Sequence, residues 1–211
     1  MIMEAVNEIL KLDCLEYIEM HYSGGEVLVK QGTIAPHIIY LKQGMVKLYL
    51  EHHNRKQPLC IEKTGFIGLE SMYNDKYFQY SVSAMNDVSV YLIELESFKK
   101  AIAENAFVGV SVIENINTRS MHLYERIITL TQKQAPGRVA DIFKCLVERI
   151  FETDEFSLPC PRKDFAEMAT ISVESLSRIL KDFKDEGIVE MDGKTVKILD
   201  KKKLDMISNV S

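Results

Sequence analysis

A six-residue run near the C-terminal end, Val173–Arg178 (VESLSR), combines a carboxylate, two hydroxyls and a guanidinium within two helical turns. Arginine can bind guanine through two parallel hydrogen bonds, glutamate can accept from the cytosine amino group, and serine can bond a base or a phosphate. At helical spacing, Val173, Glu174, Ser177 and Arg178 share the outer face of the first two turns. The residue types therefore suit contacts with base edges.

The elements that must position this run are two short helices and a turn. Pro161 suits the start of the first helix, and Thr170–Ser172 forms a tight turn in which Ser172 is the N-cap of the second helix. Each helix has a predicted buried face, made of Phe165, Ala166, Met168 and Ala169 in the first and Leu176, Ile179, Leu180 and Phe183 in the second. This order is typical of a helix-turn-helix, whose second helix enters the major groove.

A predicted β-hairpin follows the second helix. Residues Gly187–Leu199 alternate around an Asp192-Gly193 turn, and this hairpin would place Lys194 and Lys197 near phosphates. An ordinary helix carrying a Glu174–Arg178 surface ion pair is the alternative, but the complete order of helix, turn, helix and hairpin favours DNA binding. The predicted DNA-contacting set is Glu174, Ser177, Arg178, Val173, Ser172, Ser175, Arg162, Lys163, Lys194 and Lys197.

Composition adds few constraints. The formal net charge is -5, and residues 162–203 are nearly neutral, so the prediction of DNA binding depends on the motif rather than on charge. The four cysteines have no C-x-x-C pair or metal-ligand spacing and are expected to be reduced, and no metal site is predicted. Because the chain has neither a long apolar run nor a signal segment, we expect a cytoplasmic protein that does not bind membranes.

The N-terminal half has a different texture. A helical apolar rhythm covers residues 1–22, and short β-rich runs punctuated by glycines and polar turns follow from Glu26 to Leu95. Such spacing predicts an antiparallel sandwich or barrel. The predicted strands are 27–29, 38–41, 45–50, 59–61, 81–84 and 88–93.

From Ser97 the pattern is helical, and it contains a narrow apolar seam at spacings of three and four: Ile113, Ile116, Ser120, Leu123, Ile127 and Leu130. A 3.5-residue repeat is the signature of two helices packing lengthwise, which favours a dimer. The alternative is that this face packs on the β domain. The segment Ala135–Gly137 (APG) then breaks the chain and begins a second module with a helix over 138–151 and a short strand at 156–158.

These features together resemble the Crp/Fnr family of bacterial regulators over nearly the whole chain. The resemblance rests on Gly32, the strand-turn 38–44 (IIYLKQG), Phe66–Gly68, Gly137–Ala140, Ser177–Lys181 and the hairpin's Gly193–Thr195. It implies an α+β fold with a cyclic-nucleotide-binding-like antiparallel β-roll over 1–106, a dimerisation helix and hinge over 107–135, and a winged helix-turn-helix over 136–211. The E-x-x-S-R pattern of the recognition helix matches the branch that reads TTGA-type half-sites.

The sensor half departs from the members that bind cyclic AMP. Leu69 stands where those proteins carry a ribose-binding Glu, and Phe78-Gln79 takes the place of their Arg-Ser phosphate pair. A buried phosphate without a cationic partner is costly, so cyclic AMP is not expected. An iron-sulfur cluster is not expected either, because Cys14 has no neighbouring thiolates. The tentative effector pocket is Leu69, Glu70, Met72, Tyr73, Phe78, Gln79, Leu123 and Tyr124, which leaves open haem, another hydrophobic effector, or a filled core.

We therefore expect a homodimeric DNA-binding transcriptional regulator on an inverted repeat, controlled by an unidentified effector. The alternative is a haem-based redox or gas sensor coupled to DNA binding, for which His37, His122 and the His52-His53 pair are ambiguous ligands. No catalytic arrangement suggests an enzyme. The expected partners are double-stranded DNA, a second copy of the chain, RNA polymerase and a small-molecule effector.

Overall fold

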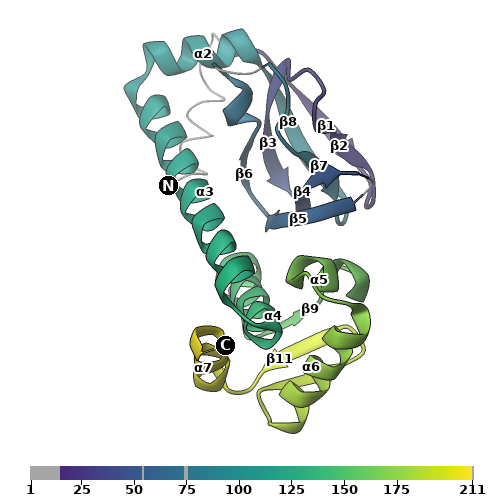
Figure 1. Ribbon diagram of the computed structural model, residues 1–211. Coiled ribbons are helices and arrows are strands. Elements are labelled where there is room, and N and C mark those ends of the chain that lie inside the picture. Colours follow the sequence, from purple (N-terminus) through teal and green to yellow (C-terminus); the bar gives the residue numbers. More distant parts are fainter. Residues whose placement is uncertain (1–14, 54, 74–75, 211) are drawn as a thin grey trace. The chain divides into compact units, whose positions relative to one another are not determined.

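The computed structural model describes residues 15–53, 55–73 and 76–210 (Figure 1). The chain divides into two compact units, one up to Leu123 and one from Tyr124 onwards. Helix α3 (Ala106–Gln132) is continuous across this boundary. Within the described residues, no helix is both long enough and apolar enough to cross a membrane.

The first unit contains two four-stranded antiparallel sheets, as the sequence predicts. In the order of hydrogen-bonded neighbours, the first sheet consists of β1 (Tyr17–Tyr22), β8 (Val88–Glu94), β3 (His37–Gln43) and β6 (Gly65–Ile67). The second sheet consists, in the same sense, of β2 (Val27–Val29), β7 (Ser81–Ala84), β4 (Val46–His52) and β5 (Arg55–Glu62).

Strand β3 explains how the unit is layered, because it is buried on both faces. Its alternate side chains point to opposite faces of the sheet. Ile38 and Tyr40 belong to a core shared with the helices, whereas Ile39 and Leu41 belong to a second core shared with the other sheet. The continuous apolar run that predicts this strand therefore serves two cores.

Helices cover one of these cores. After the short 3-10 turn η1 (Leu69–Ser71), helix α2 (Leu95–Glu104) begins where the Glu94 carboxylate accepts a hydrogen bond of 2.6 Å from the Ser97 amide. Phe98 of α2 and Val108 and Val112 of α3 are buried in the core that includes Ile38 and Tyr40. One face of the first two turns of α3 is thereby fixed to the β-roll.

The predicted N-terminal helix is wrong over residues 17–22, which form strand β1. β1 pairs along its whole length with β8, from Tyr17 opposite Ile93 to Tyr22 opposite Val88. The helix-like spacing of its apolar residues does not indicate secondary structure here, because all six side chains are at least partly exposed and no buried face constrains the pattern. Residues 1–14, including Cys14, lie outside the described part of the chain.

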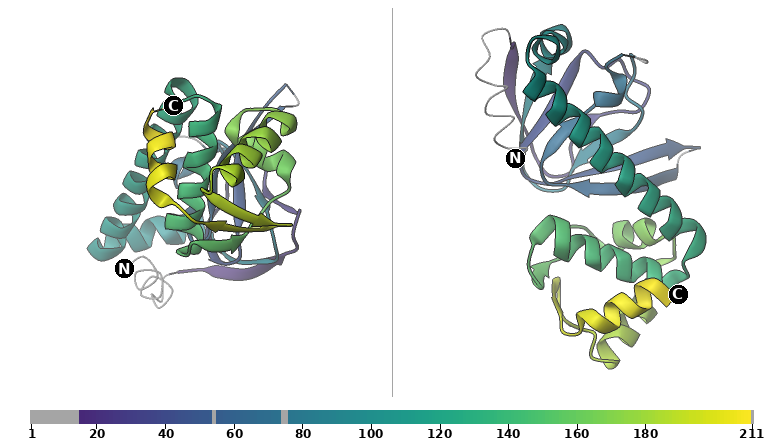
Figure 2. Two further views of the ribbon diagram at one scale, coloured as in Figure 1. Left: turned by 90° about the horizontal axis from the view of Figure 1, so that it is seen from below. Right: turned by 90° about the vertical axis from the view of Figure 1, so that its left-hand side faces the viewer.

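The second unit is mainly helical, with a three-stranded antiparallel sheet of order β10-β11-β9. Figure 2 shows its helices from two further sides. Its elements are α4 (Ala135–Cys145), the π-helical turn η2 (Leu146–Phe151), β9 (Glu155–Ser157), α5 (Arg162–Ala169), α6 (Val173–Asp185), β10 (Val189–Asp192), β11 (Thr195–Ile198) and α7 (Lys201–Val210). The break between helices that was predicted at 135–137 lies at residues 133–134, between the end of α3 and the start of α4. Pro136 lies in the first turn of α4, where a missing amide costs nothing.

Candidate nucleic-acid interface

Helix α6 begins as the sequence predicts, at a capped turn. Thr170 ends α5 in the left-handed conformation (φ 55°), and the Ser172 hydroxyl then accepts a hydrogen bond of 3.0 Å from the Ser175 amide. This cap satisfies one of the amides that have no partner within the helix. The turn therefore fixes where α6 starts and in which direction its first turns point.

The buried face of α6 anchors it to the unit. Leu176, Ile179, Leu180 and Phe183 are all buried, which confirms the predicted face. Phe143 of α4 contacts the ring of Phe165 of α5 at a centroid distance of 5.3 Å and that of Phe183 at 6.5 Å. Aromatic pairs of this geometry add to the burial of their area, so one ring holds both helices of the motif.

The opposite face of α6 is open to solvent. The side chains of Glu174 and Arg178 are 76% and 74% exposed and form an ion pair with each other, four residues apart. Val173 is also exposed, and the Ser177 hydroxyl donates a 2.8 Å hydrogen bond to the Val173 carbonyl. The structure thus brings the predicted base-reading residues together on one accessible surface.

The wing is a hairpin with a tight turn. Asp192 pairs with Thr195, so Gly193 and Lys194 form the two-residue loop, and Gly193 has the positive φ (57°) that such turns require. Lys194 is exposed on this loop. The ammonium group of Lys197 lies 3.8 Å from the Glu155 carboxylate across the β11–β9 pair. Lys194 is therefore the more available of the two predicted phosphate contacts.

The remaining predicted contacts lie at helix starts. Arg162 and Lys163 are exposed in the first turn of α5, and Ser175 is partly buried in the first turn of α6. Amides at a helix N-terminus attract phosphate oxygens. These residues add hydrogen-bond donors at the starts of α5 and α6.

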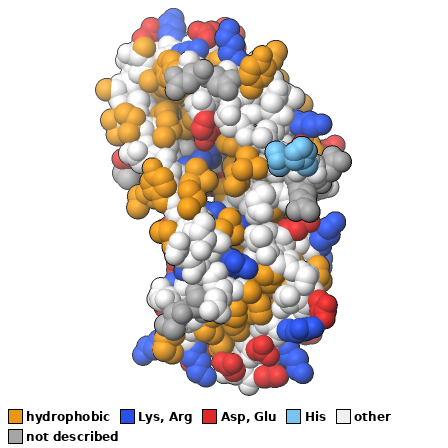
Figure 3. Space-filling view, in the orientation of Figure 1, with side chains coloured by type: hydrophobic (Ala, Val, Ile, Leu, Met, Phe, Trp, Pro, Cys, Tyr) orange, Lys and Arg blue, Asp and Glu red, His pale blue; other side chains and the backbone are white. Residues whose placement is uncertain are grey.

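The predicted seam on α3 is exposed rather than packed on the β-roll. Ile113 is 59% exposed and Ile127 is 58% exposed, and Ile116 and Leu123 are also exposed, while Ser120 and Leu130 are partly buried. The β-roll is instead contacted by the face that carries Val108 and Val112. Hydrophobic side chains are visible at the surface over this helix (Figure 3). The seam is therefore free to pack on another helix.

Arg119 is a largely buried charged residue that sequence analysis did not single out. Its guanidinium, only 11% exposed, donates to the Tyr80 hydroxyl (2.9 Å), to the Glu70 carboxylate (3.3 Å) and to the Phe66 carbonyl (2.6 Å). Its Nε lies 3.9 Å from the Glu62 carboxylate. A lone arginine on a long helix gives no motif signal, and its partners lie up to 57 residues away, at Glu62.

This Arg119 cluster is satisfied by the chain's own groups. The Tyr80 hydroxyl donates to Glu70 (3.1 Å) and accepts from the Gly68 amide (3.2 Å). Burial raises the pKa of Tyr80 well above its usual range; Arg119 opposes the shift and Glu70 adds to it. The phenol is therefore neutral at physiological pH and is held as a donor to Glu70.

A cyclic nucleotide does not fit these residues. Its phosphate would need cationic or amide donors, yet each terminal nitrogen of Arg119 already has an acceptor within the chain, and the Gly68 amide donates to Tyr80. Phe78 packs directly against Gly68, where a Cβ would lie 2.9 Å from the Phe78 Cε1 atom. The donors that a phosphate would need are therefore already bonded to other groups of the chain.

The tentative effector residues do not line one cavity. Leu69 and Met72 are buried in the core beneath the helices, Glu70 bonds to Tyr80 and Arg119, and Phe78 lines a hollow elsewhere in the β-roll. Tyr73, Gln79, Leu123 and Tyr124 are exposed. Of the four histidines considered as haem ligands, His37 lines the same hollow, His52 and His53 are exposed at the end of β4, and His122 is partly buried.

Comparisons with known proteins match both units. Residues 137–207 match the model of the Crp-like helix-turn-helix domain, and residues 19–105 match the model of the cyclic nucleotide-binding domain. Electron transport regulator A of Shewanella oneidensis is 23% identical, with 96% of this chain and 83% of that protein covered. The transcriptional activator protein FnrA of Stutzerimonas stutzeri is also 23% identical, over 83% of this chain and 74% of that protein.

The fold has a solved counterpart. The structure of FixK2 from Bradyrhizobium japonicum superposes with a TM-score of 0.84 at 22% identity, and the match covers 93% of this chain and all of that one. At this identity the likeness concerns the fold. It agrees with the two domain matches in the order of the elements, from antiparallel sheets through a long helix to a helix-turn-helix.

Proposed function

Because the chain belongs to the Crp/Fnr family of DNA-binding transcriptional regulators, we propose that it acts as a homodimer on an inverted-repeat DNA site. In each subunit α6 would lie in the major groove and the β10–β11 wing beside the backbone. The observation that carries this proposal is the exposed Glu174–Arg178 pair at the capped start of α6.

The ion pair suits base reading because it can be released at low cost. Both partners are exposed, and exposed ion pairs contribute at most about 1 kcal/mol. On DNA, Arg178 would turn to guanine O6 and N7, and Glu174 would accept from a cytosine amino group. Ser177 donates its proton to Val173, so its oxygen would act as an acceptor for a base amino group. These roles agree with the TTGA-type half-site that the family resemblance implies.

Phosphate contacts would set the register of the complex. Lys194 on the wing, Arg162 and Lys163 at the start of α5, and Ser172 and Ser175 at the start of α6 are the candidates. Such contacts add affinity without sequence preference. Because they come from three separate elements, they would hold the recognition helix at one depth and one angle in the groove.

The exposed seam of α3 supports the dimer. Soluble proteins rarely leave a long apolar stripe in water, and an inverted repeat requires two copies related by a two-fold axis. Ile113, Ile116, Leu123 and Ile127 would meet the same residues of the second copy. In this arrangement residues 1–106 would be the sensor domain, 107–135 the dimerisation helix and hinge, and 136–211 the DNA-binding domain.

Selection from random double-stranded DNA tests the proposal. The wild-type protein should enrich an inverted repeat whose half-sites are one helical turn apart. The Arg178→Ala variant should bind the selected site more weakly by about 1–3 kcal/mol and relax the preference at one base pair of each half-site. Lys202→Ala, an exposed cation of α7 outside the predicted set, is the matched control.

Two outcomes would contradict the proposal. Selection that enriches no inverted repeat would exclude a dimer that reads sequence. An equal loss of affinity by Arg178→Ala on selected and on random DNA would show that Arg178 contacts phosphate, because a phosphate contact weakens binding to every sequence alike.

A further inference from the structure

Strand β1 has one open edge. Among the strands that the structure describes, it pairs with β8 alone and stands at the end of its sheet. The Glu94 amide donates to the Glu16 carbonyl (2.8 Å), one pair beyond the end of β1. Because hydrogen-bonded pairs alternate along an antiparallel ladder, the amides and carbonyls of Tyr17, Glu19 and His21 point away from β8. These backbone groups form a row to which another strand could bond.

The other three edges of the two sheets are protected in ways that β1 is not. Native sheets block their edges with a covering element, with proline or lysine, or by keeping the edge strand short and irregular. β6 is covered by α3, since Arg119 donates to the Phe66 carbonyl (2.6 Å). β5 contains Lys56 and Pro58, and β2 has three residues and an irregular register. β1 has six residues in a regular register, with neither lysine nor proline.

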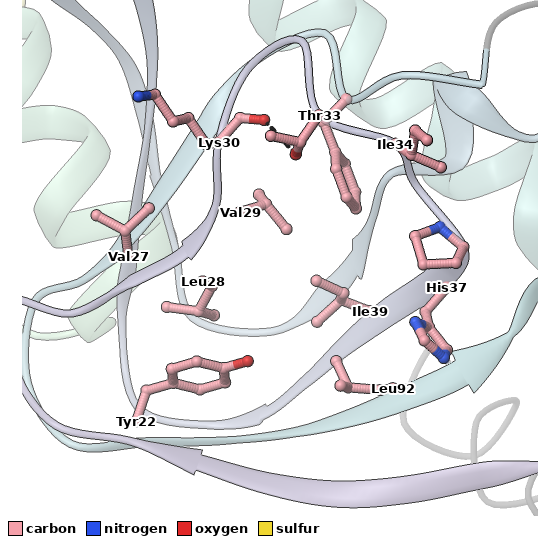
Figure 4. A pocket seen from close by; sticks show the side chains of 12 residues that line it. Tyr22, Val27, Leu28, Val29, Lys30, Thr33, Ile34, His37, Ile39 and Leu92 are labelled. Atoms are coloured by element: carbon pink, nitrogen blue, oxygen red, sulfur yellow. Dashed lines mark hydrogen bonds between the residues drawn. The ribbon is translucent and has the colours of Figure 1, made fainter.

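The inner face of β1 is apolar and incompletely covered. Ile18, Met20 and Tyr22 alternate onto this face. Tyr22 packs against the core between the two sheets, and Figure 4 shows it beside Leu28 and Leu92 in the wall of a hollow. Ile18 and Met20 are nevertheless 57% and 38% exposed. A strand added beside β1 would extend this apolar face and shield it from water.

The sequence of β1 is complementary to a second copy of itself. Residues with outward backbone groups must pair with each other, so the two-fold axis of an antiparallel pair passes through a residue. Of the two axes that overlap five residues of β1, one at Met20 places Glu19 opposite the partner's His21 and Ile18 opposite the partner's Tyr22. Pairs of opposite charge and aromatic–β-branched pairs both stabilise a ladder. The other axis, at Glu19, would place two carboxylates opposite each other.

Glu19 is an anion at neutral pH, because the Lys42 ammonium, 2.8 Å from its carboxylate, lowers its pKa. From these observations we propose that β1 pairs with β1 of a second copy about a two-fold axis at Met20. The pairing joins two four-stranded sheets into one of eight strands, in which Glu19 and His21 exchange backbone hydrogen bonds across the axis. It uses no residue of α3, so it does not depend on the proposed dimer seam. Together the two contacts would link dimers into larger assemblies.

Disulfide trapping with Met20→Cys tests the position of the axis. The two residues at the axis form a non-hydrogen-bonded pair with Cα atoms about 4.5 Å apart, a separation that a disulfide spans. Oxidation should therefore give a covalent dimer, and peptide mass spectrometry should locate the bond between the two positions 20. Ile18→Cys is the matched control on the same face, because its two copies would lie about 13 Å apart or more, four residues along the ladder. The wild-type protein gives the background from its own cysteines.

Met20→Lys tests the contact without a disulfide. It places two ammonium groups opposite each other at the axis and should weaken association at least about tenfold. Sedimentation equilibrium at up to about 1 mM protein would measure this in an Ile127→Lys background, which removes the contribution of the α3 seam. Met206→Lys, the same change at a 56% exposed position of α7, should leave association unchanged. Circular dichroism would show that each variant is folded.

Three outcomes would overturn the proposal. They are the absence of a disulfide between the two positions 20, equal disulfide yields at positions 18 and 20, and association that Met20→Lys leaves unchanged. Because the trapping is read at β1 and the association is read without the seam, failure here is distinguishable from failure of the proposed dimer or of DNA reading.

Discussion

Two arginines in the two units have opposite environments. Arg178 of α6 is 74% exposed and has one exposed carboxylate beside it, whereas Arg119 of α3 is 11% exposed and contacts Glu62, Glu70, Tyr80 and the Phe66 carbonyl. The first can exchange its partner for a ligand at little cost. The second would leave a buried phenol and two partly exposed carboxylates without their cation if it moved. Solvent exposure and the number of hydrogen-bond partners within the chain, rather than residue type, therefore separate a binding side chain from a structural one.

If this difference is right, changes on the exposed faces should weaken assembly and DNA binding while leaving each unit folded. Changes in the Arg119 cluster should lower the stability of the β-roll instead. The four predictions that follow test the difference.

The largest effect is expected at the α3 seam. Ile127→Lys removes an exposed isoleucine and places two ammonium groups opposite each other in the proposed dimer. Loss of two buried isoleucines, at about 1.5–3 kcal/mol each, should raise the dimer dissociation constant more than a hundredfold. Sedimentation velocity would measure this, and affinity for an inverted repeat would fall with it.

Thr118→Lys adds the same charge to an exposed position of α3 outside the seam and should leave the dimer intact. If both variants dissociate equally, or if neither does, the seam is not the dimer interface.

A smaller effect, on stability rather than on assembly, is expected at Arg119. Arg119→Met leaves the buried Tyr80 hydroxyl and the partly exposed Glu70 carboxylate without their cation and should lower the free energy of unfolding of the β-roll by about 1–3 kcal/mol. Hydrogen exchange of the β3 and β8 amides would report this loss. Arg149→Met, which removes a partly exposed ion pair with Glu125 in the other unit, should cost less than about 1 kcal/mol. Equal effects of the two variants would show that burial does not distinguish these arginines.

The cap of α6 should contribute less again. Ser172→Ala removes the acceptor of the Ser175 amide and should lower the free energy of unfolding of the C-terminal unit by about 1 kcal/mol. Ser172→Asp restores an acceptor and should restore stability. If Ser172 also lies beside a phosphate, the aspartate variant will bind DNA more weakly than the wild type. Unchanged DNA affinity would leave Ser172 with capping as its sole role.

The smallest effect depends on pH and concerns the cap of α2. The amides of Glu96 and Ser97 hold the pKa of Glu94 below its usual range. Because the folded pKa is lowered, the stabilisation is fully present above the unfolded pKa and is lost as pH falls through the folded pKa. Glu94→Gln should therefore cost about 0.5–1 kcal/mol at neutral pH and nothing in strong acid. A pH-independent difference in denaturant midpoint would contradict this.

The sequence predicted the C-terminal unit more completely than the β-roll, for a physical reason. Helix-turn-helix signals are local: the Ser172 cap, the Gly193 turn and the buried face of α6 each lie within a few residues. The six predicted strands also exist, because Gly and polar turns punctuate them.

What the sequence did not reveal depends on distant contacts. Strand β1 is defined by pairing with β8, about 70 residues away, and β6 is a three-residue strand that pairs with β3. The Arg119 cluster joins a helix to residues 39–57 positions earlier. The hollow likewise gathers residues from four separate segments, and Phe78 was its one member among the predicted effector residues.

A further consequence concerns the end of α3. Thr129 and Lys133 donate to the same Asp141 carboxylate of α4, at 2.6 and 2.8 Å, and Ser208 of α7 joins them at 2.5 Å. These bonds clamp the last turn of the helix to the DNA-binding unit, downstream of the boundary at Leu123. The hinge expected at 135–137 is therefore bracketed by hydrogen bonds to Asp141, and bending there would have to break them.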